Sequence, residues 1–120
     1  MPISTRWRKL DALPPKRGRD AEPGVYELAD AKKQVIYIGQ SAKDVPNRIR
    51  QHLEKKGGKN LCITDQAVYW RSRYSRVPRS EEAALLAQYL TKYEALPPCN
   101  RATQRVRDAN KRYLERSGSE

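Results

Sequence analysis

The chain has 120 residues, enough for one domain with a modest core and too few for a separate recognition module. Its 25 Lys and Arg residues outnumber its 14 Asp and Glu residues and give a formal net charge of +11. This balance is typical of a protein that binds a polyanion, most often nucleic acid. A membrane partner is disfavoured, because the sequence has no long apolar run and no strongly amphipathic basic helix.

The start of the chain is predicted to lead into the domain without belonging to it. Residues 1–22 are rich in basic side chains and contain Pro14-Pro15, which predicts a basic N-terminal arm followed by a single domain over residues 23–120. Residues 1–20 lack the apolar core of a signal peptide, so we expect a cytoplasmic location.

The domain begins with a predicted β-hairpin. Gly24–Leu28 and Gln34–Ile38 are short runs of strand-forming residues, and a polar loop over residues 29–33 separates them. A short polar loop between two such runs favours antiparallel pairing, so the two strands are expected to lie side by side.

A helix is predicted to follow the hairpin. Asp44 can cap it, Pro46 fits its first turn, and Ile49 and Leu53 form an apolar stripe before the helix ends at residues 57–58. Three more elements follow: a strand over residues 67–74, a helix from Ser80 to the prolines at 97–98, and a weakly amphipathic helix over residues 103–116. This order predicts an α+β domain with a small three-stranded antiparallel sheet flanked by helices.

The two cysteines and the single histidine give little support to a metal or disulfide framework. Cys62 and Cys99 do not form a CxxC motif, and His52 has no second histidine at ligand spacing. We therefore expect no zinc site and two ordinary, partly buried cysteine side chains.

Several polar residues suit the cleavage of a phosphodiester, which requires an aimed water, positive charge at the phosphate and a metal or acid for the leaving oxygen. Tyr26 and Tyr37 lie on the two strands of one hairpin, where their hydroxyls could share a face. Arg48 and His52 are four residues apart and project from one side of a helix. The alternative interpretation is structural, with packing tyrosines and solvated Arg48 and His52 side chains.

The order of these residues resembles the GIY-YIG nuclease family. Gly24-Val25-Tyr26 is followed by Tyr37-Ile38-Gly39, then by Arg48 and His52, and then by Asn100 after Pro97-Pro98-Cys99. The resemblance runs from about residue 23 to residue 101. It implies a DNA endonuclease that uses one divalent cation, Mg²⁺ or Mn²⁺.

The resemblance also implies roles for individual residues. Tyr37 would position or deprotonate the attacking water with Tyr26 hydrogen-bonded beside it, and Arg48 would bind the scissile phosphate. His52 would be a second polar contact or a proton carrier, and Asn100 would brace the site or simply cap a turn.

Two positions depart from the family pattern. Gln40 stands where some relatives carry lysine, so its phosphate contact would be uncharged. Ala87 stands where the family places its metal-binding glutamate, three residues before the leucine that corresponds to Leu90. Without that carboxylate a divalent cation has little to hold it, so either Glu82 takes its place or this copy is catalytically disabled. The expectation is that the chain binds DNA, cleaves it feebly, and regains cleavage in Ala87→Glu.

The remaining basic residues predict a surface that binds DNA, and they are Arg71, Arg73, Arg76, Arg101 and Arg105. An alternative function is a non-catalytic nucleic-acid-binding module on the same fold. A basic ribosome-associated protein would explain the charge and not the tyrosine and arginine spacing. Because the chain has no separate recognition module, specificity would come from this domain, from a homodimer or from another partner.

Overall fold

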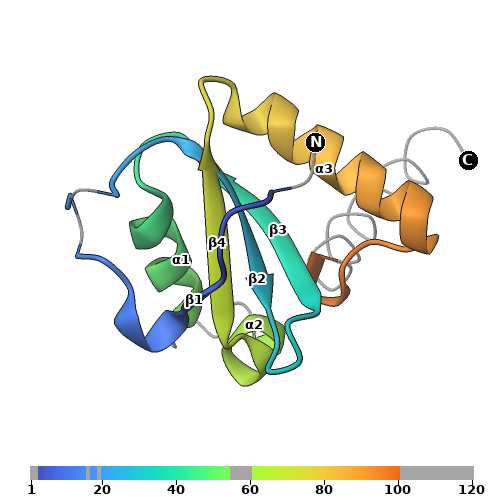
Figure 1. The fold of residues 1–120 in the computed structure, drawn as a ribbon, viewed down its shortest axis with the longest axis horizontal. Coiled ribbons are helices and arrows are strands. Elements are labelled where there is room, and N and C mark those ends of the chain that lie inside the picture. Colours follow the sequence, from blue (N-terminus) through green and yellow to red (C-terminus); the bar gives the residue numbers. More distant parts are fainter. Residues whose placement is uncertain (1–2, 16, 19, 55–60, 101–120) are drawn as a thin grey trace, which may run out of the picture.

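The computed structural model describes residues 3–15, 17–18, 20–54 and 61–100, and its α+β architecture confirms the predicted fold class. A four-stranded antiparallel sheet has the order β1-β4-β2-β3, with helices on both sides (Figure 1). The strands are β1 (Arg8–Lys9), β2 (Gly24–Ala29), β3 (Val35–Ser41) and β4 (Tyr69–Tyr74). The predicted strand count of three was therefore one too few.

The additional strand comes from the segment that was predicted to be an arm. β1 pairs with β4 in the register Arg8↔Trp70, and the Thr5 hydroxyl donates a hydrogen bond to the Ser72 carbonyl, 2.9 Å away. Ile3 is buried in the core. The segment covers the edge of β4, whose backbone groups would otherwise lack partners. A two-residue strand has no periodicity, so local sequence could not reveal it.

The predicted hairpin is present. β2 and β3 pair antiparallel, with Tyr26 opposite Gly39 and Leu28 opposite Tyr37. The Asp30 carboxylate accepts hydrogen bonds from the backbone N–H groups of Lys32 and Gln34 and closes the turn between the strands. β2 is a central strand and is buried along its whole length, which makes it a rigid support for Tyr26.

The helices are α1 (Val45–Leu53), α2 (Leu61–Gln66) and α3 (Pro78–Tyr93), with a short 3₁₀ helix at Leu10–Ala12. The Asp44 carboxylate accepts a hydrogen bond from the Asn47 backbone N–H at 3.0 Å, as predicted for the cap of α1.

Three predicted helix features differ from the structure, and the first is that α1 ends at Leu53, before the predicted end at residues 57–58. α3 begins at Pro78 without a side-chain cap, so Ser80 is an internal residue of the helix and not its cap. α3 ends where Glu94 adopts a left-handed conformation with φ of 59°, ahead of the prolines. α2 was not predicted. The helix predicted over residues 103–116 lies outside the described residues.

Each face of the sheet has its own core. The core between the sheet and the helices α1 and α2 includes Tyr26, Leu28, Ile49 and Trp70. The core between the sheet and α3 includes Ile3, Val25, Ile38 and Leu85. Figure 1 shows α1 and α3 on opposite sides of the sheet. Among the described residues, no helix has the length and apolar character needed to cross a membrane.

Candidate active site

The two hairpin tyrosines meet over Gly39. Their ring centroids are 6.2 Å apart, and a Cβ on Gly39 would lie 2.5 Å from the Tyr26 ring end and hydroxyl and 2.8 Å from the Tyr37 ring. Both rings occupy the space that any side chain at position 39 would need. Gly39 therefore permits the close approach of the two tyrosines.

The other motif glycine has a different purpose. A Cβ on Gly24 would lie 2.3 Å from the Arg73 carbonyl oxygen on β4. This contact is with backbone, which cannot turn aside as a flexible side chain can. Gly24 therefore allows β2 and β4 to pair at the start of the strand that carries Tyr26.

His52 completes an aromatic and polar cluster with the two tyrosines. Its ring centroid is 5.1 Å from that of Tyr37, and its Nε2 is 2.7 Å from the Tyr26 hydroxyl oxygen. Burial, and next the positive charge of Arg48, lower the pKa of His52 to about 4. His52 is therefore neutral near pH 7 and can accept a proton or a hydrogen bond.

The Tyr26 hydroxyl keeps its proton. Burial raises its pKa well above the ordinary value of 10.0, and the neighbouring Tyr37 and Glu82 also raise it, while Arg48 lowers it. A protonated Tyr26 next to a neutral His52 donates its hydrogen bond to Nε2. Tyr37 is half-buried and Tyr26 is fully buried, so Tyr37 is the more accessible of the two.

Arg48 joins this cluster from the first half of α1. It lies one helical turn before His52, interacts with the Tyr26 hydroxyl, and donates a hydrogen bond to Gln51 at 3.2 Å. Its side chain is otherwise exposed. The cluster thus has a buried polar base and a cationic, solvent-facing rim.

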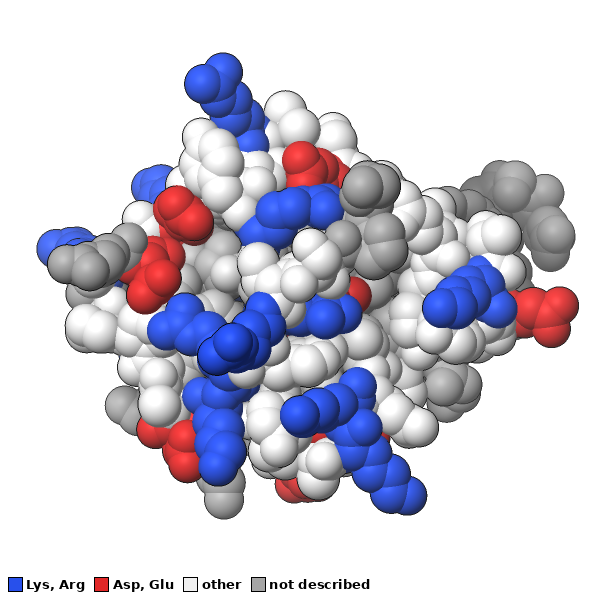
Figure 2. All heavy atoms as spheres, in the orientation of Figure 1, with Lys and Arg blue, Asp and Glu red and all other residues white. Residues whose placement is uncertain are grey.

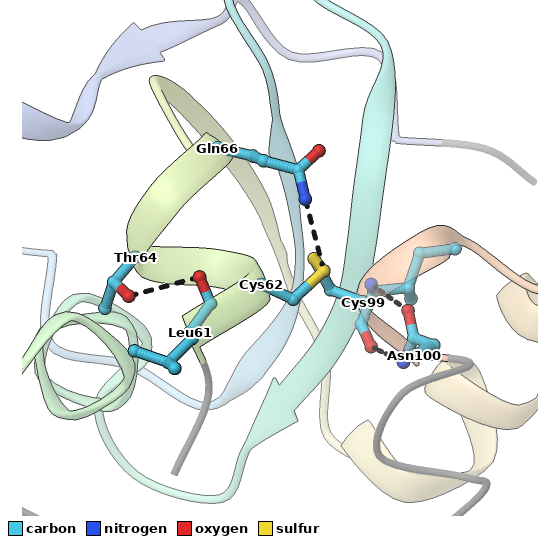
Figure 3. Close-up of a disulfide and its surroundings, with 7 residues drawn as sticks. Leu61, Cys62, Thr64, Gln66, Cys99 and Asn100 are labelled. Atoms are coloured by element: carbon cyan, nitrogen blue, oxygen red, sulfur yellow. Dashed lines mark hydrogen bonds between the residues drawn. A yellow bond between two sulfur atoms is a disulfide. The ribbon is translucent and has the colours of Figure 1, made fainter. Parts of the chain in front are cut away.

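Asn100 holds the strand that carries Tyr37. Its Oδ1 accepts a hydrogen bond from the Ile38 backbone N–H at 2.7 Å, and its Nδ2 donates one to the Ile38 carbonyl at 3.0 Å (Figure 3). Both bonds fall on the edge of β3 that no other strand covers. Asn100 is a positioning residue, since Ile38 stands between Tyr37 and Gly39.

A disulfide between Cys62 and Cys99 supports that position. It joins α2 to the segment immediately before Asn100, with 5.5 Å between the two Cα atoms (Figure 3). The prediction of two ordinary cysteines was wrong. Two cysteines are too few for a framework of several bridges, but this does not exclude one bridge between residues 37 positions apart.

The carboxylate nearest the cluster is provided by α3. Glu82 is half-buried, and its charge contributes to the raised pKa of Tyr26. Ala87 is exposed, and its carbonyl accepts a hydrogen bond from the Thr91 hydroxyl at 2.9 Å. Five residues separate the two positions, which turns them about 140° apart around the helix axis. Among the described residues, Glu82 is the acid whose charge acts on Tyr26.

A divalent cation would depend largely on that one carboxylate. Within the described ranges, no group of three or more His, Cys, Asp or Glu side chains could form a metal site. Mg²⁺ is commonly held by one or two carboxylates, waters and substrate phosphate oxygens, so a single carboxylate such as that of Glu82 is compatible with such a cation.

The predicted basic contacts separate into three groups. Arg71 pairs with the buried Glu27 at 2.7 Å and stacks on Trp7, with its guanidinium 4.0 Å from the ring centroid. Arg73 pairs with Glu81 at 3.0 Å. Arg76 is exposed. Arg101 and Arg105 lie outside the described residues. Arg71 and Arg73 therefore already have structural partners.

Positive charge is nevertheless spread over the surface. Figure 2 shows Lys and Arg side chains in several groups on the face that carries β1 and β4, with fewer acidic side chains among them. Gln40, at the end of β3, lines a groove together with Arg48, next to the cluster. This is where the phosphate contact predicted for Gln40 would lie.

Comparison with known proteins points in the same direction as this geometry. A family model described as the GIY-YIG catalytic domain matches residues 22–95, which is more than half of the chain. The match spans the hairpin, α1, β4 and α3. No curated protein and no solved structure matches the chain.

Proposed function

The chain belongs to the GIY-YIG catalytic domain family, and on this premise we propose that it is an endonuclease that hydrolyses the phosphodiester backbone of DNA. The observation that carries the proposal is the contact between Tyr26, Tyr37, His52 and Arg48 around Gly39. In this cluster a half-buried, neutral histidine lies within the electrostatic influence of an exposed arginine that can meet a phosphate.

In the proposed mechanism the Tyr37 hydroxyl orients a water for attack on the phosphorus. A bond forms from the water oxygen to phosphorus, and the bond from phosphorus to the leaving oxygen breaks. The water passes its proton to bulk solvent, while neutral His52, with Nε2 2.7 Å from the Tyr26 hydroxyl oxygen, accepts the Tyr26 hydrogen bond and holds that hydroxyl beside Tyr37. The leaving oxygen takes its proton from solvent.

Arg48 supplies the permanent positive charge. Its guanidinium matches the oxygens of a phosphate, on which negative charge grows during attack. Glu82 would hold a divalent cation, Mg²⁺ or Mn²⁺, which when bound neutralises charge on the phosphate and the leaving oxygen. Asn100 acts through the backbone of Ile38 and keeps Tyr37 in register.

A second function keeps the fold and the DNA binding without cleavage. The observation that favours it is Ala87, a methyl group at the position where the family resemblance places the metal-binding glutamate. In that case Glu82 is simply an acid near the start of α3, where it interacts favourably with the helix dipole.

The two functions are separated by one set of assays. The chain, Glu82→Gln and Ala87→Glu are incubated with single- and double-stranded DNA, with Mg²⁺, Mn²⁺ or EDTA, and the products are resolved on a denaturing gel. We expect metal-dependent cleavage by the unaltered chain that is lost in Glu82→Gln. The exposed Glu94, changed to Gln, is a control acid on the segment that ends α3. Cleavage that appears only in Ala87→Glu would establish the non-catalytic alternative.

A further inference from the structure

We propose that the groove between α1 and α3 binds the backbone phosphate next to the scissile one, and that Arg79 is the residue that contacts it. This inference rests on the proposed function, since it places a DNA strand across the cluster. It adds a binding residue that the sequence pattern did not single out.

The groove is formed by three elements that meet at one end of the sheet. Its volume is about 560 Å³, within the range of sites that bind small ligands. It is lined by Gln40, Ser41, Ala42, Arg48, Val77, Pro78, Arg79 and Ser80. The end of β3 forms its floor, and α1 and the start of α3 provide its two sides.

The chemistry of the lining suits a phosphodiester. Two guanidinium groups, two hydroxyls and one side-chain amide line the groove, and none of the described lining residues is acidic. The two arginines therefore give the described lining a net positive charge, which favours an anion. Arginine also binds phosphate oxygens in a bidentate manner, which lysine cannot do.

The groove is continuous with the candidate active site. Arg48 lines the groove and also interacts with the Tyr26 hydroxyl. Arg48 and Arg79 line the same groove, so a strand whose scissile phosphate meets Arg48 would run its next phosphate toward Arg79. Arg76 is exposed nearby in the sequence but does not line the groove. Arg79 is thus the better candidate for a defined contact.

The test compares the salt dependence of DNA binding for the unaltered chain, Arg79→Ala and Lys32→Ala. Lys32 is exposed in the hairpin turn, so its replacement by alanine removes the same unit of charge at a position away from the groove. Fluorescence anisotropy with a labelled oligonucleotide gives the slope of log affinity against log salt. Each phosphate contact contributes roughly −0.9 to that slope, so Arg79→Ala should make it shallower by about one, and Lys32→Ala should leave it unchanged. Equal slopes for the unaltered chain and Arg79→Ala would overturn the proposal.

A second measurement changes the DNA as well as the protein. Once the cleavage position is known, the phosphate on either side of it is replaced by a neutral methylphosphonate. At one of these positions the replacement should weaken binding of the unaltered chain and have no further effect on Arg79→Ala, because the same contact is already missing. Full additivity at both positions would contradict the proposal. Binding measurements do not require cleavage, so a shallower slope in an inactive chain would refute the endonuclease and retain the groove.

Discussion

Both faces of the sheet carry buried polar side chains, and these side chains have different kinds of partner on the two faces. Under α3, Glu27 is 5% exposed, pairs with Arg71, and that guanidinium stacks on Trp7. Under α1, Tyr26 and the half-buried His52 hydrogen-bond to one another, Tyr37 is half-buried beside them, and Arg48 lines the groove. In the first set the charges are paired, and Glu27 and Arg71 line a pocket of their own. The second set is open to the groove at the exposed Arg48, and this difference in pairing distinguishes a structural ion pair from a candidate site.

Replacing one arginine on each face should separate the role of Arg48 in cleavage from the role of Arg71 in stability most clearly. Arg48→Ala should lower the cleavage rate by about 10²–10³-fold and leave the free energy of unfolding nearly unchanged, because Arg48 is exposed and acts on the phosphate. Arg71→Ala should do the reverse. It should reduce the free energy of unfolding by roughly 3 kcal/mol, the lower end of the range for a broken buried pair, because Arg71 is 20% exposed. Cleavage rates and urea unfolding of both variants provide the measurement.

Opening the disulfide should weaken the support of the open face. Because 37 residues separate Cys62 and Cys99, Cys62→Ser should reduce the free energy of unfolding by about 3–4 kcal/mol. Cleavage should also fall under conditions where the protein remains folded, since the bridge precedes Asn100. A reductant titration followed by unfolding and cleavage assays checks this. Unchanged cleavage in the folded, reduced protein would show that Asn100 holds β3 without the bridge.

A larger side chain at Gly39 should crowd the tyrosine cluster and reduce the free energy of unfolding by less than loss of the disulfide does. Gly39→Ala places a methyl group against the Tyr26 ring, which is fully buried and hydrogen-bonded to His52 and so cannot move aside freely. Overpacking of this kind costs about 1–3 kcal/mol, and the displaced tyrosine should also slow cleavage. Gly18→Ala is a crowded comparison outside the cluster, because a Cβ there would lie 2.9 Å from the Pro15 carbonyl oxygen and away from the two tyrosines. Equal cleavage by both variants would contradict the close packing at Gly39.

The last effect concerns pH. The pKa of His52 in the folded protein is about 4, below its ordinary value of 6.5, so the unfolded chain binds more protons between those two values. The stability that depends on neutral His52 is therefore complete above about pH 6.5 and is lost as the pH falls toward 4. His52→Asn should flatten this part of the stability profile. An unaltered slope between pH 6.5 and 4 in that variant would assign the dependence to other groups.

Local patterns in the sequence predicted the hairpin and α1, because turn residues and the Asp44 cap act over a few positions. They could not predict β1 or the Cys62–Cys99 bridge, which depend on segments that are far apart in the chain. The motif residues predicted Tyr26 and Arg48 as neighbours. Arg79 was missed, because one arginine among 25 basic residues becomes distinctive only when the groove is seen.

The same reasoning applies to the acid on α3. Alignment by motif points to position 87, and in the structure Ala87 is exposed while the charge of Glu82, five residues earlier, acts on Tyr26. Spacing along a sequence gives a position, but the packing of a helix decides which of its sides meets the site.

The central claim is that the open face cleaves DNA with the Tyr37 hydroxyl. The most direct test is cleavage of a labelled DNA by the unaltered chain and by Tyr37→Phe, with Mg²⁺ or Mn²⁺, alongside anisotropy measurements of binding. The removal of a single hydroxyl should reduce cleavage by about 10²–10⁴-fold and change affinity little. Full cleavage by Tyr37→Phe, in a preparation where the unaltered chain is active, would contradict the account.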